Sequence, residues 1–306
     1  MKIALLGCGY LGKIHAKCLK EIKNVDIVGV YDISQEAAKE TAEQFDTVAY
    51  LNLQALLESC DIIDITAATT AHFELAATAI RAGKHCFIEK PLTATVDEAV
   101  KLIELAQKHN TIIQVGHVER YNPAFLAVLP HLSRPFFIEA QRLSEFNRRG
   151  ADVSVVHDLM IHDIDLVLSL ISSKLIDIHA IGYKYITETI DFAEARFLFA
   201  NGEVAHIVAN RVARQSLRKM CIFQPEAYFM VNFQEKKTEK IAFNDHKTTV
   251  TEIPILEHNA IVQELSDFIK VVLHRSAPKI TMEDGLNALS IADKVVTKIL
   301  QQNAPL

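Results

Sequence analysis

The sequence predicts two domains of different class: an α/β domain with a doubly wound parallel sheet, then an α+β domain on an open, mostly antiparallel sheet. Three observations predict this. Short apolar runs alternate with segments of helical periodicity from residue 1 to about 117, as in parallel sheets wound with helices. A glycine-rich turn joins the first run to the first helical segment. Beyond it, long segments alternate apolar and polar residues, as half-buried strands do. We expect domains at 1–118 and 119–306.

The first domain is expected to hold six strands. They cover residues 2–6, 25–32, 47–50, 62–66, 85–88 and 111–117. The helices expected between them include residues 34–45, 53–59, 72–83 and 95–109. Ser34 has the hydroxyl that suits an N-cap. Because ligands bind at the carboxyl ends of the strands in such sheets, the loops after these strands are the candidate binding loops.

Three glycines follow the first strand at G-x-G-x-x-G spacing, and a helical segment begins directly after them. Gly7 would allow the tight turn, Gly9 would let the backbone approach a pyrophosphate, and Gly12 would let the helix pack closely on the strand. The anion would then bind free N–H groups at the helix N-terminus. Tyr10 and Leu11 lie in the same turn and are expected to contact the dinucleotide.

The second strand ends in a carboxylate, Asp32, twenty residues after Gly12. A carboxylate at this place accepts hydrogen bonds from the ribose hydroxyls of a dinucleotide and repels a 2′-phosphate. Ile33, the next residue and an expected cofactor contact, offers no compensating cation. The sequence therefore predicts NAD rather than NADP as the cofactor.

Two further loops follow strands at the same edge of the sheet. The cofactor contacts expected after the fourth strand are Ala67, Thr69 and His72. The fifth strand ends in Glu89 and Lys90, both also expected at the cofactor, and Pro91 biases Lys90 toward an extended backbone. The spacing leaves two interpretations of the Lys90 side chain open. Its amine could face a ligand, or it could be solvated and paired with Glu89.

The second domain is expected to contain one mostly antiparallel sheet. Asn201-Gly202 predicts a two-residue hairpin turn, and one face is polar enough to be solvated or to meet a partner subunit. We expect a homodimer or homotetramer that associates through this sheet. The alternating segments are residues 136–146, 177–186, 192–212, 220–233 and 240–255, and helices near 257–274 and 281–301 close the chain.

A helix with a polar stripe is expected between the first two of these segments. The stripe consists of Ser154, Asp158, His162, Asp165 and Ser169, which step by four, four, three and four residues. Asp158 and His162 are close enough to interact, and an aspartate that holds an imidazole can tune it as a general base. A solvated stripe on an amphipathic helix is the alternative that the residues alone leave open.

Three motifs and the change of fold resemble the Gfo/Idh/MocA oxidoreductase family. The motifs are Gly7-x-Gly9-x-x-Gly12 with His15, Glu89-Lys90-Pro91, and Asp158-x-x-x-His162. The resemblance implies an N-terminal Rossmann domain, NAD(P), and oxidation or reduction of a hydroxyl-bearing carbon, usually on a sugar, cyclitol or nucleotide sugar. It also implies that Lys90 and His162 flank the reacting hydroxyl, and that Asp158 orients His162.

Several arginines precede the predicted catalytic helix. Arg142, Arg148 and Arg149 could bind a phosphate, which guanidinium geometry suits. With the surrounding residues 142–156, they are similar to the branch that oxidises the 3-hydroxyl of UDP-N-acetylglucosamine. The substrate-binding residues expected are Lys90, His117, Arg120, Arg148, Arg149, Asp158 and His162.

Composition limits the other possibilities. The net charge of −6 argues against a general affinity for nucleic acid or anionic membranes. The five cysteines form no C-x-x-C pair, so we expect a reducing cytoplasm and no metal site. Leu5-Leu6-Gly7-Cys8 resembles a lipoprotein cleavage box, but the apolar stretch before Cys8 is too short for a signal sequence. No run approaches the length that spans a bilayer.

Two other functions remain open at this point. A redox-neutral, NAD-dependent glycosidase on the same scaffold would release a free sugar with no net NADH. A non-catalytic NAD(H)-binding regulatory protein would need the glycine-rich turn but neither Lys90 nor His162, so the presence of both residues counts against it.

Overall fold

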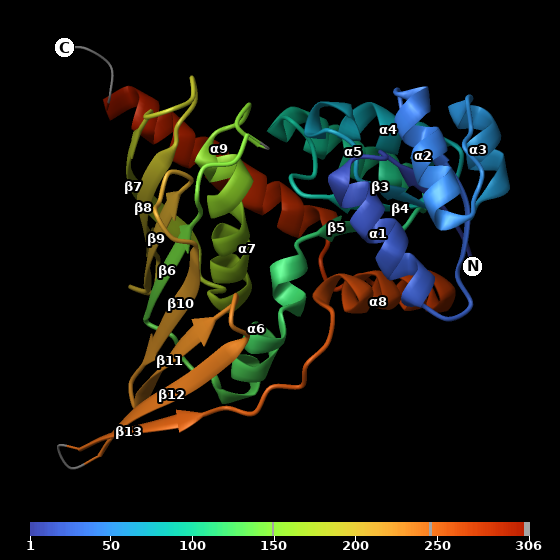
Figure 1. The fold of residues 1–306 in the computed structure, drawn as a ribbon. Helices are drawn as coiled ribbons and strands as arrows, with labels where there is room; N and C mark the ends of the chain where they lie inside the picture. Colours follow the sequence, from blue (N-terminus) through green and yellow to red (C-terminus); the bar gives the residue numbers. More distant parts are fainter. Residues whose placement is uncertain (149, 245–246, 303–306) are drawn as a thin grey trace. The chain divides into compact units, whose positions relative to one another are not determined.

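A computed structural model describes residues 1–148, 150–244 and 247–302 (Figure 1). The chain divides into two compact units. Unit 1 comprises Met1–Val118 and Asn259–Asn287, and unit 2 comprises Glu119–His258 and Ala288–Leu306. One boundary coincides with the predicted one after residue 118, whereas Asn259–Asn287, predicted within the second domain, belongs to unit 1.

Unit 1 is built on a five-stranded sheet in which all strands are parallel. In spatial order the strands are β2 (Asp26–Tyr31), β1 (Lys2–Leu6), β3 (Ile62–Ile65), β4 (His85–Glu89) and β5 (Ile113–Gly116). β3, β4 and β5 are buried along their whole length, as expected for a sheet covered on both faces. The strands after β1 are added first on one side of it (β2) and then on the other (β3, β4 and β5). The order of the strands therefore reverses between β1 and β3, and ligands bind at this point in such folds.

The strand predicted at residues 47–50 is not part of this sheet. Ala49 makes only a single bridge to Val30 of β2, and Val48 and Leu51 are 55% and 68% exposed. Asn52 then caps the next helix by accepting hydrogen bonds from two backbone N–H groups. The prediction of six strands was therefore wrong, because this segment follows the edge of β2 for one residue pair and is too exposed to continue.

Helices cover both faces of the unit 1 sheet (Figure 1). Ser34 caps α2 as predicted, and Phe268 packs on Phe87 of β4 with 5.8 Å between ring centroids. α1 and α8 pack side by side, as do α4 and α5. The burial of Phe268 explains why residues 259–287 belong to this unit. The helices are α1 (Tyr10–Glu21), α2 (Gln35–Phe45), α3 (Leu53–Ser59), α4 (Thr69–Arg81), α5 (Val96–His109) and α8 (Ala260–His274).

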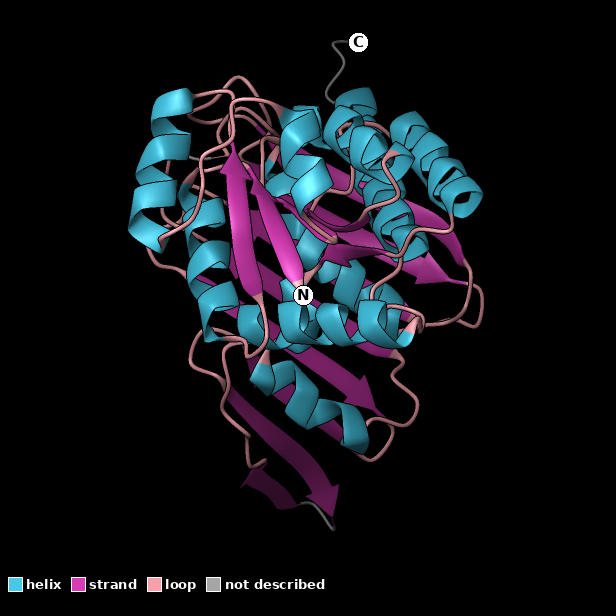
Figure 2. Ribbon diagram, turned by 90° about the vertical axis from the view of Figure 1, so that its right-hand side faces the viewer, coloured by secondary structure: helices cyan, strands magenta, loops and turns pink. Residues whose placement is uncertain are grey.

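Unit 2 is built on an eight-stranded sheet. Among the described residues of this sheet, β6 and β9 pair in parallel and the other neighbouring strands pair antiparallel, which confirms the predicted class. The hairpin of β12 and β13 forms one edge (Figure 2). In spatial order the strands are β13 (Lys247–Glu252), β12 (Lys237–Asn244), β11 (Ala227–Asn232), β10 (Leu217–Gln224), β6 (Phe137–Leu143), β9 (Val204–Asn210), β8 (Phe192–Phe199) and β7 (Leu175–Tyr183).

The turn between β8 and β9 is one residue longer than predicted. The N–H of Phe199 donates to Glu203 O (2.9 Å), which leaves residues 200–202 between this pair. Gly202 has φ +89° and donates its N–H to Phe199 O. A three-residue loop that ends in a glycine of positive φ is the next most common hairpin after the two-residue type.

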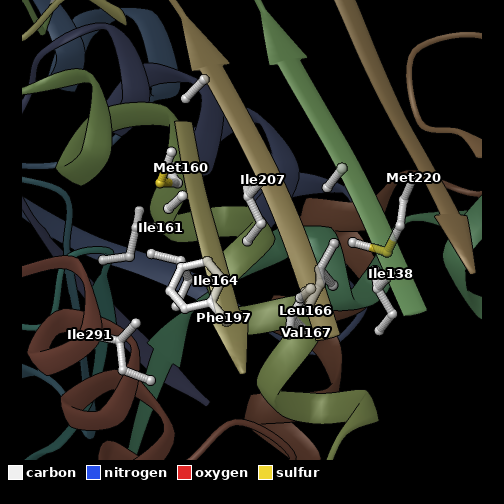
Figure 3. Packing of buried hydrophobic residues seen from close by; sticks show 14 of the residues in the cluster. Ile138, Met160, Ile161, Ile164, Leu166, Val167, Phe197, Ile207, Met220 and Ile291 are labelled. Atoms are coloured by element: carbon white, nitrogen blue, oxygen red, sulfur yellow. The ribbon is translucent and has the colours of Figure 1, made fainter. Parts of the chain in front are cut away.

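One face of the unit 2 sheet is buried under helices. α6 (Pro123–Val128), a π-helical turn over Val156–Met160, α7 (Ile161–Leu170) and the part of α9 (Met282–Gln302) after residue 287 contribute apolar residues to this core. Figure 3 shows Phe197 and Ile207 from the sheet packed with Ile164 and Ile291 from the helices. Within the described part of the chain, no helix is long and apolar enough to cross a membrane.

Candidate active site

The glycine-rich turn packs directly against the loop that follows β3. Gly7 has φ +105°, and a Cβ there would lie 2.5 Å from Ala67 N and 2.7 Å from Ala67 Cα. At Gly12, a Cβ would overlap Gly7 O and approach Thr66 Oγ1. These two positions therefore exclude any side chain, and they hold the start of α1 tightly against the ends of β1 and β3.

Gly9 has a different environment, because a Cβ there would meet no atom of the described residues within 4 Å, its chain neighbours apart. It is the N-cap of α1 and, as a glycine, has no side chain that could cap this helix end. Open space at a helix N-terminus beside tightly packed glycines suits a pyrophosphate, which the N–H groups of the first turn would bind. The residues present thus fit the dinucleotide that the sequence predicts.

Asp32 lies beside this turn at the end of β2. Its carboxylate accepts hydrogen bonds from Cys8 N (2.7 Å) and Ser34 N (2.8 Å). The carboxylate is therefore fixed next to the glycines, where the ribose of a dinucleotide is expected. Ile33 is 94% exposed and Tyr10 is 64% exposed, so both have surface that a bound molecule could cover.

His72 has a structural role that differs from the predicted cofactor contact. It lies in the first turn of α4 and is 1% exposed. Its Nδ1 is 2.9 Å from Pro91 O, and its Nε2 is 3.0 Å from Ala67 O. Burial lowers the pKa of the imidazole. Both ring nitrogens thus join the loop after β3 to the loop after β4, and Thr69 is the first residue of the same helix.

Glu89 and Lys90 end β4 as the sequence predicts. Glu89 is 8% exposed and accepts a hydrogen bond from Lys90 N (3.1 Å). Its Oε1 also lies 3.1 Å from His15 Nε2. Although burial alone would raise the pKa of Glu89, the His15 contact and the charge of Lys90 hold that pKa below its usual value. The carboxylate is therefore kept ionised at the base of Lys90.

Asp64 is a buried residue of this region that was not predicted from the sequence. It is 1% exposed in β3, and its Oδ2 lies 2.9 Å from His15 Nδ1. Its signal in the sequence is a single charged residue within an otherwise apolar strand, Ile62–Ile65. Such a residue needs a buried partner, but the sequence does not say which one.

In unit 2, Asp158 lies in the π-helical turn and His162 is the second residue of α7. The predicted single helix is thus two segments with different hydrogen bonding. The backbone that precedes the π-helical turn packs against the side chain of Asp158. Gly150 has φ +73°, and a Cβ there would lie 2.8 Å from Asp158 Oδ2. Both Asp158 and His162 are partly buried.

Arg211, which no pattern in the sequence singles out, holds the segment that leads into this helix. It is 3% exposed. Its guanidinium donates to Gly150 O (2.6 Å), Val153 O (2.5 Å) and Ile190 O (2.8 Å). Three backbone carbonyls from two segments are thus fixed by one side chain, which therefore stabilises the approach to Asp158.

Two arginines that were expected to bind substrate are part of buried ion pairs. Arg142 is 3% exposed and donates to Asp163 Oδ1 and Oδ2 (2.8 and 2.9 Å) and to Glu119 Oε1 (2.7 Å). Arg120 donates to both carboxylate oxygens of Asp165, at 2.8 and 2.6 Å. The expectation that Arg142 binds phosphate was wrong, because Asp163 and Glu119 already engage its guanidinium.

The contact between Arg120 and Asp165 also changes the interpretation of the predicted polar stripe. Asp165 is 1% exposed and belongs to a buried ion pair rather than to a solvated face. Of the other residues expected at the substrate, Arg148 is exposed, His117 is 1% exposed, and Arg149 lies outside the described residues. Lys90 and His117 belong to unit 1, and Arg148, Asp158 and His162 belong to unit 2.

Both units match models of one protein family. Residues 1–117 match the model described as oxidoreductase family, NAD-binding Rossmann fold. Residues 130–227 match the model of the GFO/IDH/MocA C-terminal domain.

Individual relatives are dehydrogenases. UDP-N-acetylglucosamine 3-dehydrogenase from Acidithiobacillus ferrooxidans is 34% identical over 281 residues, which cover 89% of this chain and 88% of that protein. Inositol 2-dehydrogenase/D-chiro-inositol 3-dehydrogenase from Halalkalibacterium halodurans is 30% identical over 57% of this chain and 53% of that protein.

Solved structures agree with this assignment. The structure of UDP-N-acetylglucosamine 3-dehydrogenase GnnA from A. ferrooxidans superimposes with a TM-score of 0.92 at 32% identity, over 98% of this chain and 97% of that one. Levoglucosan dehydrogenase in complex with NADH and levoglucosan shares the fold, with a TM-score of 0.89 at 19% identity over 99% and 98% of the two chains. The chain therefore belongs to the Gfo/Idh/MocA family and is an NAD-dependent dehydrogenase with an N-terminal Rossmann fold.

Proposed function

We propose that the protein oxidises the 3-hydroxyl of a UDP-N-acetyl sugar, with UDP-N-acetylglucosamine as the first candidate, and that NAD⁺ accepts the hydride. The observation that carries this proposal is the 34% identity to UDP-N-acetylglucosamine 3-dehydrogenase along 89% of the chain. The similarity of residues 142–156 to that branch, noted in the sequence, supports the same substrate class.

In this proposal, the hydroxyl proton passes to His162 while the hydrogen on the same carbon leaves as a hydride. NAD⁺ supplies the acceptor for that hydride. Lys90 donates a hydrogen bond to the oxygen as negative charge develops on it, which stabilises the transition state. His162 acts as the general base, and Asp158 orients its ring.

The surroundings of these residues support their roles. Glu89 is kept ionised beside Lys90, which favours the ammonium form of the lysine. Asp158 is confined by Gly150, whose carbonyl Arg211 binds. Both arrangements place buried groups directly beside a residue with a proposed role in the reaction, as preorganised sites require.

We propose that Arg148 binds the diphosphate of the substrate. It is exposed and precedes the helix that carries Asp158 and His162. Arg142 is not proposed, since it is buried in an ion pair. Arg120, also predicted at the substrate, would act indirectly by holding Asp165 of α7.

We also propose that the enzyme assembles as a homodimer or homotetramer through the uncovered face of the unit 2 sheet. Ile181 and Tyr183 of β7 and Leu198 of β8 are 42%, 49% and 37% exposed, and apolar groups of this kind are common at subunit interfaces. Light scattering after size exclusion would measure the subunit count, and a monomer at micromolar concentration would contradict the assembly.

The proposed location is the reducing cytoplasm. All five cysteines are free, which is consistent with action in that compartment.

The test of the function is NADH formation, followed by absorbance, with paired substrates. UDP-N-acetylglucosamine is compared with free N-acetylglucosamine, UDP-glucose and myo-inositol, each with NAD⁺ and with NADP⁺. We expect kcat/KM for UDP-N-acetylglucosamine with NAD⁺ to exceed that for the free sugar at least about 100-fold, because diphosphate contacts provide several charge-assisted hydrogen bonds. Equal rates with inositol or the free sugar would contradict the substrate proposal. Sugar release without NADH would instead indicate a glycosidase.

A further inference from the structure

We propose that Asp64 and His15 are positioning residues which, through Glu89, hold Lys90 in place and keep its amine cationic. We name these three buried side chains the Asp64–His15–Glu89 chain. The inference rests on the proposed role of Lys90 in the reaction, and it adds two residues that touch neither the substrate nor the dinucleotide in that mechanism.

The geometry of the chain is continuous. His15 lies on α1, between Asp64 of β3 and Glu89 of β4. Its Nδ1 is 2.9 Å from Asp64 Oδ2, and its Nε2 is 3.1 Å from Glu89 Oε1. The exposed fractions are 1% for Asp64, 1% for His15 and 8% for Glu89. Glu89 Oε2 then accepts the backbone N–H of Lys90 at 3.1 Å.

The contacts of His15 indicate how many protons the chain holds. A carboxylate oxygen and a ring nitrogen without a proton are both acceptors, so the hydrogen bond between Nδ1 and Asp64 Oδ2 contains one proton. Nε2 lies within ion-pair distance of Glu89 Oε1 without the geometry of a hydrogen bond, and a second proton on Nε2 makes this contact attractive. With both protons on His15, the charges of −1, +1 and −1 sum to −1. If one proton moves to a carboxylate, the sum is unchanged. The chain therefore carries one net negative charge in a buried place.

A buried net charge needs a counter-ion. Lys90 supplies it, because its positive charge helps to hold the pKa of Glu89 below the usual value. The interaction is mutual, so the carboxylate of Glu89 in turn favours the cationic amine. His15 contributes more to this effect than Lys90, because its contact and its charge lower the pKa of Glu89 more than the charge of Lys90 does, whereas burial raises that pKa.

The other groups near the chain do not replace this interaction. Cys18 on α1 feels the charge of His15, but burial raises the pKa of the thiol, so it stays neutral. His72 on α4 faces Glu89, but burial lowers the pKa of its ring. Phe87 covers one side of His15, with 5.8 Å between ring centroids. Within the described residues, the cations that lower the pKa of Glu89 are thus His15 and Lys90.

The arrangement also joins the dinucleotide turn to the reacting lysine. His15 follows Gly12 by three residues on the same helix, one turn further along. The helix whose N-terminus would hold the pyrophosphate therefore carries the imidazole that contacts Glu89. A G-x-G-x-x-G-x-x-H sequence makes this link possible because i and i+3 lie on one face.

The experiment compares pH profiles of kcat for the wild type, His15→Leu and His15→Gln from pH 6 to pH 10. His15→Leu removes the partner of Glu89, so Glu89 becomes protonated and the limb that reports loss of the Lys90 proton moves down by about one to two pH units. His15→Gln retains an N–H for Glu89, so the limb moves less. The KM for NAD⁺ should change by less than about threefold in both, since neither variant alters the glycines.

Two controls separate the proposal from a merely structural role. His85 is also a buried histidine, and it lies at the start of β4. It accepts a hydrogen bond from the N–H of Ile112 and is not part of the Asp64–His15–Glu89 chain. His85→Gln should leave the shape of the pH profile unchanged. Lys90→Met should abolish the limb, together with most of the activity; if it does not, the proposed function fails independently of this inference.

A second measurement works without turnover, in case His15→Leu folds poorly. In wild-type protein with ¹⁵N-labelled histidine, NMR at pH 8 should show both ring nitrogens of His15 protonated, and the absence of this signal from His15→Gln assigns it to His15. That signature should vanish in Asp64→Asn, because the variant lacks the carboxylate charge that raises the pKa of His15, and the asparagine amide can donate to an unprotonated Nδ1. The inference would be overturned by a wild type with no such histidine, or by a His15→Leu profile that superimposes on the wild type after scaling.

Discussion

The carboxylate of Asp158 packs against the backbone of Gly150. A Cβ built on Gly150 would lie 2.8 Å from Asp158 Oδ2 and 3.0 Å from Asp158 Cγ, and the φ of Gly150 is +73°. Arg211 donates to the carbonyl of the same glycine. The position of the aspartate that is proposed to orient His162 is therefore fixed by a segment outside its own helix.

Gly150→Ala should reduce catalysis as well as stability. The new methyl group has to displace Asp158, so we expect kcat to fall at least about tenfold, whereas the positive φ costs about 1 kcal/mol of folding free energy. The control is Gly202→Ala, at φ +89° with no atom near its Cβ. It should show the stability cost of the positive φ alone and leave kcat unchanged. Equal kcat values for the two variants would remove Asp158 from the mechanism.

Substitutions at the glycine-rich turn should separate binding from folding. Gly9→Ala places a methyl group in open space, so the melting temperature should be unchanged while the Kd for NADH rises at least about tenfold, because the methyl group excludes the pyrophosphate. Gly12→Ala has to displace Gly7 O and Thr66 and should lower the melting temperature itself. Calorimetry with and without NADH measures both effects. Unchanged NADH affinity in Gly9→Ala would place the dinucleotide elsewhere.

Cofactor preference should depend on the charge of Asp32. In Asp32→Asn, loss of the carboxylate removes its repulsion of a 2′-phosphate, and we expect the ratio of kcat/KM for NADP⁺ to that for NAD⁺ to rise at least about tenfold. Ile33 is 94% exposed, so Ile33→Arg can add a cation without loss of packing and should raise the ratio further. A wild-type enzyme that uses NADP⁺ as well as NAD⁺ would contradict the proposed role of Asp32.

Asp191 should make stability depend on pH in acid. Burial alone would raise its pKa, but hydrogen bonds from Thr187, Ile186 and Tyr185 lower the pKa from 3.8 to about 2. A depressed pKa stabilises the folded state at pH values above 4, and this contribution is lost as the pH falls from 4 toward 2. Urea unfolding should show Asp191→Asn less stable by about 1 kcal/mol at pH 7, with a smaller difference at pH 3. A difference that stays constant with pH would refute the shift.

Local patterns in the sequence were enough to predict most of the fold. The glycine spacing, the apolar strands and the period of the helices act over a few residues, so they are readable along the chain. Residues 47–50 were predicted wrongly because a β-prone segment beside an edge strand need not continue the sheet. The return of residues 259–287 to unit 1 depends on Phe268 packing on Phe87, a contact between distant parts of the chain.

The partners of the charged residues could not be predicted in this way. Arg142 was expected to bind phosphate, but it pairs with Asp163. Asp163 lies one position after His162 of the predicted polar stripe and was not part of that prediction. His15 meets Asp64 49 residues away, and Arg211 meets Gly150 61 residues away. The sequence shows that such buried charges need partners, but only the fold shows which residues are adjacent.

The most direct test of the account is the fate of the hydrogen on the oxidised carbon. UDP-N-acetylglucosamine carrying deuterium at C3 is incubated with the enzyme and NAD⁺, and the reduced cofactor is analysed by mass spectrometry. The account predicts one deuterium in each NADH formed, together with a 3-keto nucleotide sugar. Reduced cofactor without deuterium, or consumption of the nucleotide sugar with no reduced cofactor at all, would contradict it.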